Sequence, residues 1–171
     1  MNENPKPMLP GRDILIRNEF RPGDLGELIR LHGVFYSMEQ KFDTTFEAYV
    51  GEPLARFWLR KNKRERMWLV EKENHLCGSI AIVEKEDRSA QLCWFFLIPE
   101  LRGRLLGEFL LKQAIEFAKT SGYHLLYLWT EKSLQKAISL YIRCGFELID
   151  EIRSIKWGGE RIEQKFFLAL K

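Results

Sequence analysis

The sequence predicts one domain of mixed α/β (α+β) class, with a mostly antiparallel sheet of six to seven strands flanked by about four helices. Three observations lead to this prediction. Short runs alternate apolar with polar residues, longer runs repeat apolar residues at three- and four-residue spacing, and the two kinds of run follow one another along the chain. The expected order is β-α-α-β-β-β-α-β-α-β-β, with a flexible lead-in at residues 1–11 and the domain at residues 12–171.

The N-terminal third predicts a strand and two helices. Residues 13–20 alternate as a strand does, and Asp24 after a Pro-Gly turn is expected to cap the first helix. The apolar face of that helix continues through His32, Tyr36 and Glu39. Residues 44–47 resemble a capping box and predict a second helix to about Lys61, kinked or restarted at Pro53.

The remainder alternates strands with two further helices. Strands are expected at 67–71, 77–85 and 90–98, followed by a helix over 106–118 that ends at Gly122. The apolar run 124–130 predicts a strand buried on both faces. A helix over 134–141 stops at Gly145, and residues 146–157 pair with 161–170 across Gly158-Gly159.

Composition excludes several classes of protein. With 46% hydrophobic residues and a net charge of +3, the 171 residues fit an ordinary globular domain and give no case for a nucleic-acid partner. The basic run at 60–66 is interpreted as a solvated helix end and loop in preference to a phosphate-binding patch. Three widely spaced cysteines indicate neither a disulfide framework nor a metal site. No signal peptide or membrane span is recognisable, so we expect a cytoplasmic protein.

The segment 97–107 is the first candidate for chemistry. A strand ends there, a loop with arginines and a glycine follows, and a helix begins. The N–H groups at a helix N-terminus bind anions such as pyrophosphate, and a glycine lets the anion approach the backbone. A plain strand-to-helix connection with a solvated arginine is the alternative interpretation.

Two motifs together resemble the GNAT acetyltransferases. Arg102-Gly103-Arg104-Leu105-Leu106-Gly107 resembles the Arg/Gln-x-x-Gly-x-Gly/Ala signature of that family, and Ala137-x-x-x-Tyr141-x-x-x-Gly145-Phe146 resembles its second signature. A narrower match to the acetyltransferase half of MarR/GNAT fusion regulators rests on His32-Gly33, Tyr36, Glu39, Phe42-Asp43 and Phe46-Glu47. The resemblance implies the GNAT fold and transfer of acetyl from acetyl-CoA, as co-substrate and without a metal, to a primary amine of a small molecule or peptide. Whether the chain is a monomer or a homodimer is left open.

The resemblance also implies roles for particular residues. The cofactor is expected at Leu97, Ile98, Arg102, Gly103, Arg104, Leu105, Leu106, Gly107, Ala137 and Tyr141. Tyr141 takes the position of the general acid that supports the leaving thiolate, and Glu39 is the candidate base. The acceptor side is expected at His32, Tyr36, Glu39 and Trp94.

Several alternatives stay open at this stage. Leu105 stands where the family has a glycine, which favours a non-catalytic acyl-CoA sensor as the second functional hypothesis. Glu39 could attract a cationic substrate or form a local salt bridge, and Tyr141 could be a packing residue. His32 fits a satisfied core histidine better than a base, and a Cys93–His32 thiol nucleophile is a remote alternative.

Overall fold

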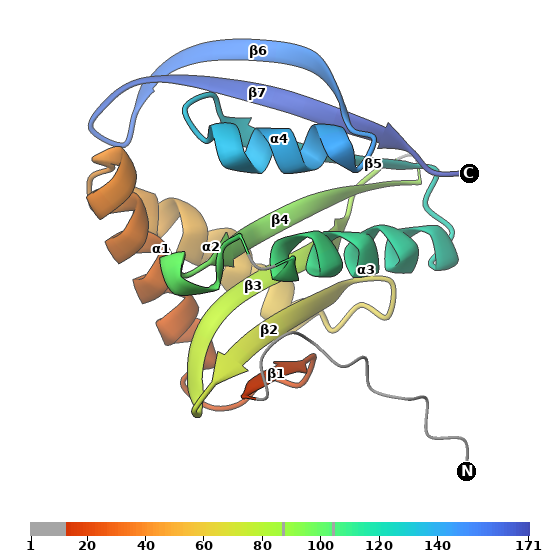
Figure 1. Cartoon of the computed structure of the whole chain (residues 1–171), viewed down its shortest axis with the longest axis horizontal. Coiled ribbons are helices and arrows are strands. Elements are labelled where there is room, and N and C mark those ends of the chain that lie inside the picture. The colour runs from red at the N-terminus through yellow and green to blue at the C-terminus, as the bar shows by residue number, and fades with distance from the viewer. Residues whose placement is uncertain (1–12, 87, 104) are drawn as a thin grey trace.

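Seven strands and four α-helices make up the described residues of the computed structural model, which are 13–86, 88–103 and 105–171 (Figure 1). The strands are β1 (Ile14–Arg17), β2 (Arg66–Lys72), β3 (His75–Glu84), β4 (Ser89–Leu97), β5 (Leu125–Glu131), β6 (Glu147–Lys156) and β7 (Gly159–Ala169). The helices are α1 (Asp24–Gln40), α2 (Thr45–Arg60), α3 (Leu106–Thr120) and α4 (Gln135–Arg143), and a short 3-10 helix, η1 (Pro99–Leu101), precedes α3. The predicted order of strands and helices is confirmed, while the predicted lead-in at 1–11 lies outside the described residues.

The strands form one sheet in the order β1-β2-β3-β4-β5-β7-β6. All neighbours pair antiparallel except β4 and β5, which run parallel. That parallel pairing covers only residues 89–91 against 125–127, although both strands continue further. Beyond those three residues, β4 and β5 are no longer paired, so the sheet opens between them.

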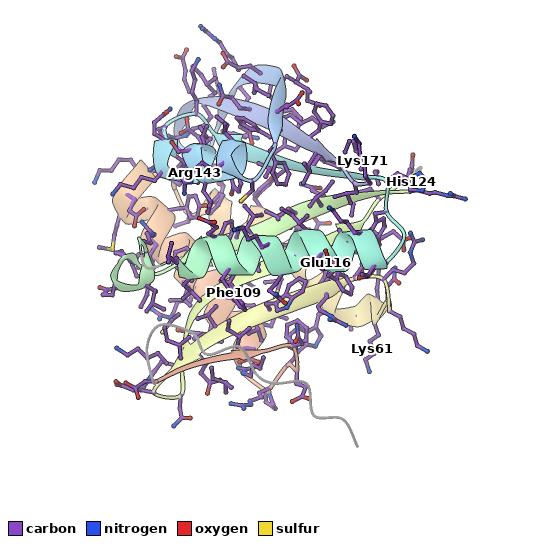
Figure 2. The ribbon with its side chains drawn as sticks, turned by 45° about the vertical axis from the view of Figure 1, so that its right-hand side comes forward. Lys61, Phe109, Glu116, His124, Arg143 and Lys171 are labelled. Carbon is purple, nitrogen blue, oxygen red and sulfur yellow. The ribbon has the colours of Figure 1, made fainter. Side chains whose placement is uncertain are left out.

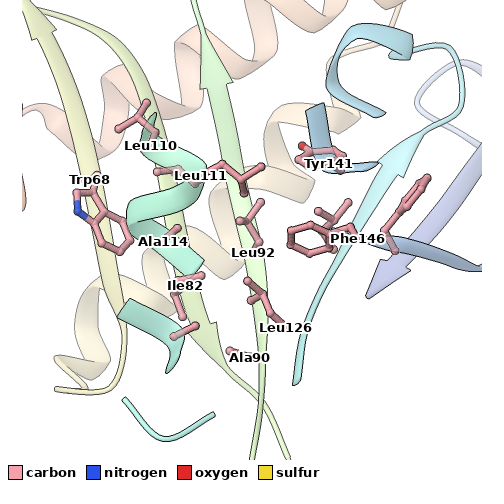
Figure 3. Packing of buried hydrophobic residues seen from close by; sticks show 14 of the residues in the cluster. Trp68, Ile82, Ala90, Leu92, Leu110, Leu111, Ala114, Leu126, Tyr141 and Phe146 are labelled. Carbon is pink, nitrogen blue, oxygen red and sulfur yellow. The ribbon is translucent and has the colours of Figure 1, made fainter. Parts of the chain in front are cut away.

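Two layers of helices bury the two faces of the sheet. Helix α3 crosses one face, with Phe109 near its start and Glu116 further along (Figure 2), and α4 lies beneath β6 and β7 on the same side (Figure 1). The core on this face includes Trp68, Ile82, Leu92, Leu111 and Leu126 (Figure 3). Helices α1 and α2 supply the second core, which packs on β2, β3 and β4. The sheet is therefore covered by helices on both faces only around β2, β3 and β4.

The incomplete cover explains one wrong prediction. Strand β5 was expected to be buried on both faces, but burial alternates along it, with Leu126, Leu128 and Thr130 buried and their neighbours half-buried. Among the described residues, the core beneath α1 and α2 contains no residue of β5. Half of the β5 side chains therefore face a partly open surface.

The two predicted helix caps, Asp24 for α1 and Thr44 for α2, are also wrong, because neither side chain caps its helix. Gly23 is the N-cap of α1, and the Asp24 carboxylate instead accepts hydrogen bonds from the Arg17 guanidinium and the Arg21 backbone N–H. Thr44 makes no side-chain cap, and Asp43 accepts from the backbone N–H of Thr45.

The second helix does not restart at the proline, whereas the alternative, a kink there, stays a prediction. Helix α2 continues through Pro53 from Thr45 to Arg60 without restarting. A proline lacks one N–H, so it removes a single hydrogen bond to the preceding turn. Around this position Val50, Leu54 and Phe57 are buried in the core, so tertiary packing supports the helix there.

Candidate active site

The opening between β4 and β5 lies beside the predicted cofactor loop. At the end of β4, the Ile98 N–H donates to the Cys77 carbonyl of β3 at 2.9 Å. Backbone groups alternate in direction along a strand, so those of Leu97 face the opposite way, toward the opening. The Leu97 carbonyl accepts a hydrogen bond from Arg102 Nε at 2.7 Å. Two residues at this end of β4 were predicted to contact the cofactor. The backbone of Leu97 faces the opening, whereas the N–H of Ile98 bonds β3 and does not face it.

A bulge in β4 sets the position of the strand beside the opening. The register between β3 and β4 shifts between Ser79 and Ala81, and Trp94 has a φ of 47°. The fully buried Ser79 donates its hydroxyl to the Trp94 carbonyl at 2.7 Å. A Cβ at Gly78 would lie 2.6 Å from the Phe96 carbonyl oxygen, so only glycine allows the close approach of the two strands. Sequence analysis missed Gly78 and Ser79, although a Gly-Ser pair inside an apolar strand pattern is a signal of a bulge.

Among the residues that the structure describes, no side chain caps the N-terminus of α3. Leu105 is the N-cap of α3 and makes no side-chain cap hydrogen bond, while the Phe109 N–H bonds the Leu105 carbonyl. The N–H groups of Leu106, Gly107 and Glu108 therefore have no acceptor within the helix. Gly103 has a φ of 73° with nothing within 4 Å of an added Cβ. Arg104, which was also predicted to bind the cofactor, lies outside the described residues.

Two residues of the predicted loop differ in burial. The side chain of Leu106 is 1% exposed and belongs to the core, so only its backbone faces the loop. A Cβ on Gly107 would have Leu97, Phe95 and Leu140 at 3.6 Å, which is ordinary contact. Gly107 therefore lies against the end of β4 and against α4.

Tyr141 lies on α4 between the separating strands. Figure 3 shows its ring between β4 and β5 with the hydroxyl directed to the β4 side, and its centroid is 6.2 Å from that of Phe95 on β4. Burial raises the pKa of Tyr141 well above its usual value, and the nearby Tyr36 hydroxyl adds to the rise. The hydroxyl consequently stays protonated at neutral pH and is available as a hydrogen-bond donor. Ala137, one helical turn earlier, is half-buried against the same core.

The first helix brings Tyr36 and Glu39 to the cofactor loop. Glu39 Oε2 accepts from Arg102 Nη1 at 2.9 Å, joining two residues that sequence analysis assigned to different halves of the site. Burial, together with the Glu39 charge, raises the pKa of Tyr36 to about 12, and Arg102 opposes this. Tyr36, Glu39, Arg102 and Tyr141 thus share one neighbourhood at the mouth of the opening.

His32 and Trp94 are placed differently from one another. The His32 side chain is buried, with Nδ1 donating to the Leu28 carbonyl at 2.8 Å, and its ring packs 5.3 Å from that of Phe96. Burial lowers the pKa of His32 to about 4, although the Leu28 hydrogen bond acts in the other direction. This matches a neutral core histidine, but the ring is only half satisfied, because among the described residues nothing bonds its buried Nε2. Trp94 is half-buried at the bulge and packs against Phe57 on the α2 side of the sheet.

Other features of the described structure bear on the alternatives. Burial raises the pKa of the Cys93 thiol to about 12, which disfavours a thiolate nucleophile. Arg60 and Arg64 of the basic run form ion pairs with Glu65 and Glu84, and Arg66 stacks on Phe117, which fits the predicted helix end and loop. No described helix is long and apolar enough to cross a membrane.

Comparison with known proteins gives the family. The model of the acetyltransferase (GNAT) family matches residues 31–146, more than half of the chain. The chain therefore belongs to the GNAT acetyltransferase family, as the two sequence motifs implied. The narrower resemblance to MarR/GNAT fusion regulators stays a prediction.

Two curated relatives are similar to this chain in sequence. The uncharacterized N-acetyltransferase MJ1207 of Methanocaldococcus jannaschii is 29% identical over 134 residues, 72% of this chain and 57% of its own length. The uncharacterized N-acetyltransferase YjgM of Escherichia coli is 34% identical over 86 residues, 48% of this chain and 52% of its own. The chain thus spans about half the length of the curated relatives that it matches.

The solved structures show the same fold. An acetyltransferase from Streptococcus agalactiae superimposes with a TM-score of 0.77 at 22% identity, covering 94% of this chain and 100% of that one. Spermidine N-acetyltransferase from Vibrio cholerae, solved with CoA and spermine, gives a TM-score of 0.66 at 21% identity and covers 93% and 96%. The predicted GNAT fold is thereby confirmed.

Proposed function

We propose that this chain transfers the acetyl group of acetyl-CoA to a primary amine. The observation that carries the proposal is the opening between β4 and β5, which has a helix N-terminus without a side-chain cap on one side and a protonated tyrosine beside it. Among the structural neighbours, the Vibrio cholerae enzyme was solved with CoA and spermine, and the yncA protein of Salmonella typhimurium was solved with acetyl-CoA. These neighbours support the choice of co-substrate and of an amine acceptor, whether small molecule or peptide.

The residues around the opening fit the parts of such a co-substrate. The free N–H groups at the start of α3 and the charge of Arg102 suit a pyrophosphate, because a helix N-terminus stabilises anions. The backbone of Leu97 offers hydrogen bonds along the opening. Gly107 and Ala137 place little side-chain volume next to the β4 end and the core, which suits a pantetheine arm passing there. Acetyl-CoA supplies an activated thioester to this arrangement.

The chemistry asked of the protein is modest. The amine nitrogen attacks the thioester carbonyl carbon, a C–N bond forms, the C–S bond breaks, and the amine loses a proton. Because burial raises the pKa of Tyr141, its hydroxyl is a poor source of a full proton at neutral pH. We therefore assign it as a hydrogen-bond donor to the leaving sulfur, where negative charge develops.

Glu39 lies where the cofactor loop meets the acceptor side. Its ion pair with Arg102 holds the carboxylate at the mouth of the opening and orients the arginine. We propose that the free lone pairs of Glu39 face the acceptor amine, either as base or as an attracting charge. The tyrosine on the same helix, Tyr36, and the half-buried Trp94 complete the proposed acceptor side, and His32 is left to the core.

The decisive experiment measures binding and turnover together. Acetyl-CoA is expected to raise the melting temperature, and a panel of primary amines is expected to include at least one that releases free thiol. Thermal stabilisation without thiol release for any small amine or peptide would favour the acyl-CoA sensor. Absence of both would contradict the proposal.

Tyr141→Phe tests the catalytic residue. We expect the dissociation constant of acetyl-CoA to stay nearly unchanged and turnover to fall about 10²-fold, because only the transition state uses the hydroxyl. Since Tyr141 stays protonated, the loss is expected to be constant from about pH 6 to pH 9. Unaltered turnover would make Tyr141 a packing residue.

Glu39→Gln tests the acceptor side. We expect impaired use of the amine with a much smaller change in acetyl-CoA affinity. A loss in turnover that shrinks as pH rises identifies a base, and a loss in KM that fades with salt identifies charge attraction. Glu52→Gln is the matched control, because Glu52 is an exposed carboxylate paired with Arg56 away from the opening. Equal kinetics of the two variants would place Glu39 outside the site.

A further inference from the structure

Strand β6 is the outer edge of the sheet and carries an unusual number of exposed apolar residues. It ends the strand order and forms the upper border of the molecule in Figure 1. Leu148, Ile149, Ile152 and Ile155 are exposed by 50%, 51%, 41% and 86%. Long apolar edge strands offer free backbone groups to another strand, and proteins usually protect them with charges or a cover. In the described structure, nothing pairs with the outer side of β6.

The sequence of β6 is complementary to itself when it runs antiparallel to a second copy. Two copies can be related by a twofold axis that is perpendicular to the sheet and passes between the two Ile152 residues. Each residue then lies opposite the residue of the other copy for which the two residue numbers add up to 304, about the centre at Ile152. In that register Glu151 meets Arg153 and Asp150 meets Ser154, each twice. Both Asp150 and Ser154 lie on one side of the strand, and both Glu151 and Arg153 lie on the other, as opposite residues in a ladder must.

A bulge in β6 continues this complementarity to the ends of the strand. The register between β6 and β7 shifts between Leu148 and Asp150, so one extra residue is taken up there. Leu148 and Ile149 then lie opposite Ile155 of the second copy, and Glu147 lies opposite Lys156. The register thus places the exposed apolar residues against one another and brings opposite charges across the seam at two places in each half. Within their own chain, Glu151 also pairs with Lys132 and Lys156 with Glu163, so each would serve two partners.

We infer that β6 is a homodimer interface, in which the β6 strands of two copies pair antiparallel and join their sheets into one. The occupant is a second copy because the charges of β6 complement β6 itself. This inference is independent of the proposed acetyl transfer. Hydrogen bonds between the two strands supply affinity, and cross-strand charge pairs fix the register.

The central ion pair gives a test of both interface and register. In the Arg153→Glu variant, the new glutamate faces Glu151 of the other copy. In the Glu151→Arg variant, the new arginine faces Arg153 of the other copy. Two copies of either variant therefore repel each other. A mixture of the two variants restores both opposite-charge pairs. Lys119→Glu, the same change of charge on an exposed site of α3, is the control.

Sedimentation equilibrium of the full chain at up to about 100 μM measures the outcome, since this range reveals dimers with micromolar dissociation constants. We expect wild type and Lys119→Glu to be dimers. The dissociation constants of Arg153→Glu and of Glu151→Arg are each expected to be at least about ten-fold higher, and the equimolar mixture is expected to recover the wild-type value. Circular dichroism confirms that each variant is folded. A monomeric wild type, unchanged dimers in both single variants, or no recovery on mixing would overturn the inference. A monomer whose β6 instead captures an added peptide would equally overturn it.

Discussion

Leu105 adopts a backbone conformation that leucine rarely takes. Its φ is 63° and its ψ is −9°, and its side chain is 72% exposed. The left-handed region costs a residue with a Cβ about 1–2 kcal/mol, whereas glycine enters it freely. The family motif has glycine at this position, so leucine here adopts, at the expense of strain, a conformation that glycine enters freely.

Leu105→Gly is therefore expected to raise stability. Relief of the strain exceeds the extra chain entropy of glycine, which leaves a gain of up to about 1 kcal/mol in the free energy of unfolding. Binding of acetyl-CoA is expected to tighten if the exposed side chain crowds the anion. Denaturant unfolding and calorimetry measure the two effects.

The control for this substitution is an exposed leucine in ordinary helical conformation. Leu59 on α2 is 78% exposed, and Leu59→Gly is expected to cost about 1 kcal/mol because glycine disfavours a helix. Opposite signs for the two substitutions support the strain in the loop. A loss of stability in both would show that Leu105 is not strained.

At the scale of helices and strands, periodicity predicted the order of the elements, and local polar chemistry predicted their ends poorly. The alternating run before Pro99 and the helical stripe after it sit where β4 and α3 lie. The predictions of helix caps at Asp24 and Thr44 were wrong for two reasons. The Asp24 carboxylate bonds Arg17, which is a tertiary contact, and the neighbouring Asp43 accepts the hydrogen bond from the Thr45 N–H in place of Thr44. Motif spacing is likewise local, and it correctly predicted that a loop joins β4 to α3 between Leu97 and Leu106, while cofactor binding by that loop stays a prediction.

Contacts between distant segments were beyond prediction. Glu39 and Arg102 are 63 residues apart in the sequence, and no local pattern in either segment predicts that they form an ion pair. The bulge at Trp94 depends on Gly78 and Ser79 of the neighbouring strand. The shape of the opening follows from such pairs, so sequence analysis named most residues around it without predicting how they meet.

Gly78→Ala tests the contribution of the β3–β4 approach. The new Cβ would lie 2.5 Å from Leu97 Cδ2 and 2.6 Å from the Phe96 carbonyl, and a backbone atom cannot move aside cheaply. We expect a loss of about 1–3 kcal/mol in the free energy of unfolding and weaker acetyl-CoA binding. Gly26→Ala on α1 is the control, because open space surrounds that position and alanine favours a helix. Equal effects of the two substitutions would contradict this account.

At the scale of the whole molecule, a buried ion network links strand β1, helix α1 and strand β2. The Arg17 guanidinium bonds Asp24 at 2.8 Å and Glu71 at 2.7 Å, and the side chains of all three are less than a tenth exposed. Burial alone would raise the pKa of Asp24, but the hydrogen bonds from Arg17 and Arg21 lower it overall. The Arg17 hydrogen bond lowers the pKa of Glu71 against the effect of burial. Strand β1 and helix α1 are thus tied to β2 by charge as well as by packing.

These shifts determine how stability depends on pH. A carboxyl group whose folded pKa is depressed stabilises the protein above its unfolded pKa, and this contribution disappears as pH falls through the folded value. The ordinary values are 3.8 for Asp24 and 4.5 for Glu71, so the contribution is complete at neutral pH and declines below about pH 4. Arg17 stays charged throughout, because its pKa is raised by Asp24 and Glu71 despite burial.

Arg17→Met is expected to remove the network and to change this pH dependence. Without the guanidinium, two buried carboxylates lose their main partner, which costs about 3–5 kcal/mol at pH 7. Burial then opposes ionisation of both carboxyl groups with only Arg21 of the described residues left to favour it, so their pKa values rise relative to wild type and protonation relieves the variant as pH falls. The difference in melting temperature between wild type and variant should be largest near neutral pH and shrink toward about pH 4. Arg30→Met breaks only the exposed pair with Glu27 and should cost less than about 1 kcal/mol. A difference for Arg17→Met that is small, or constant between about pH 7 and pH 4, would mean that the network does not tie β1 and α1 to β2.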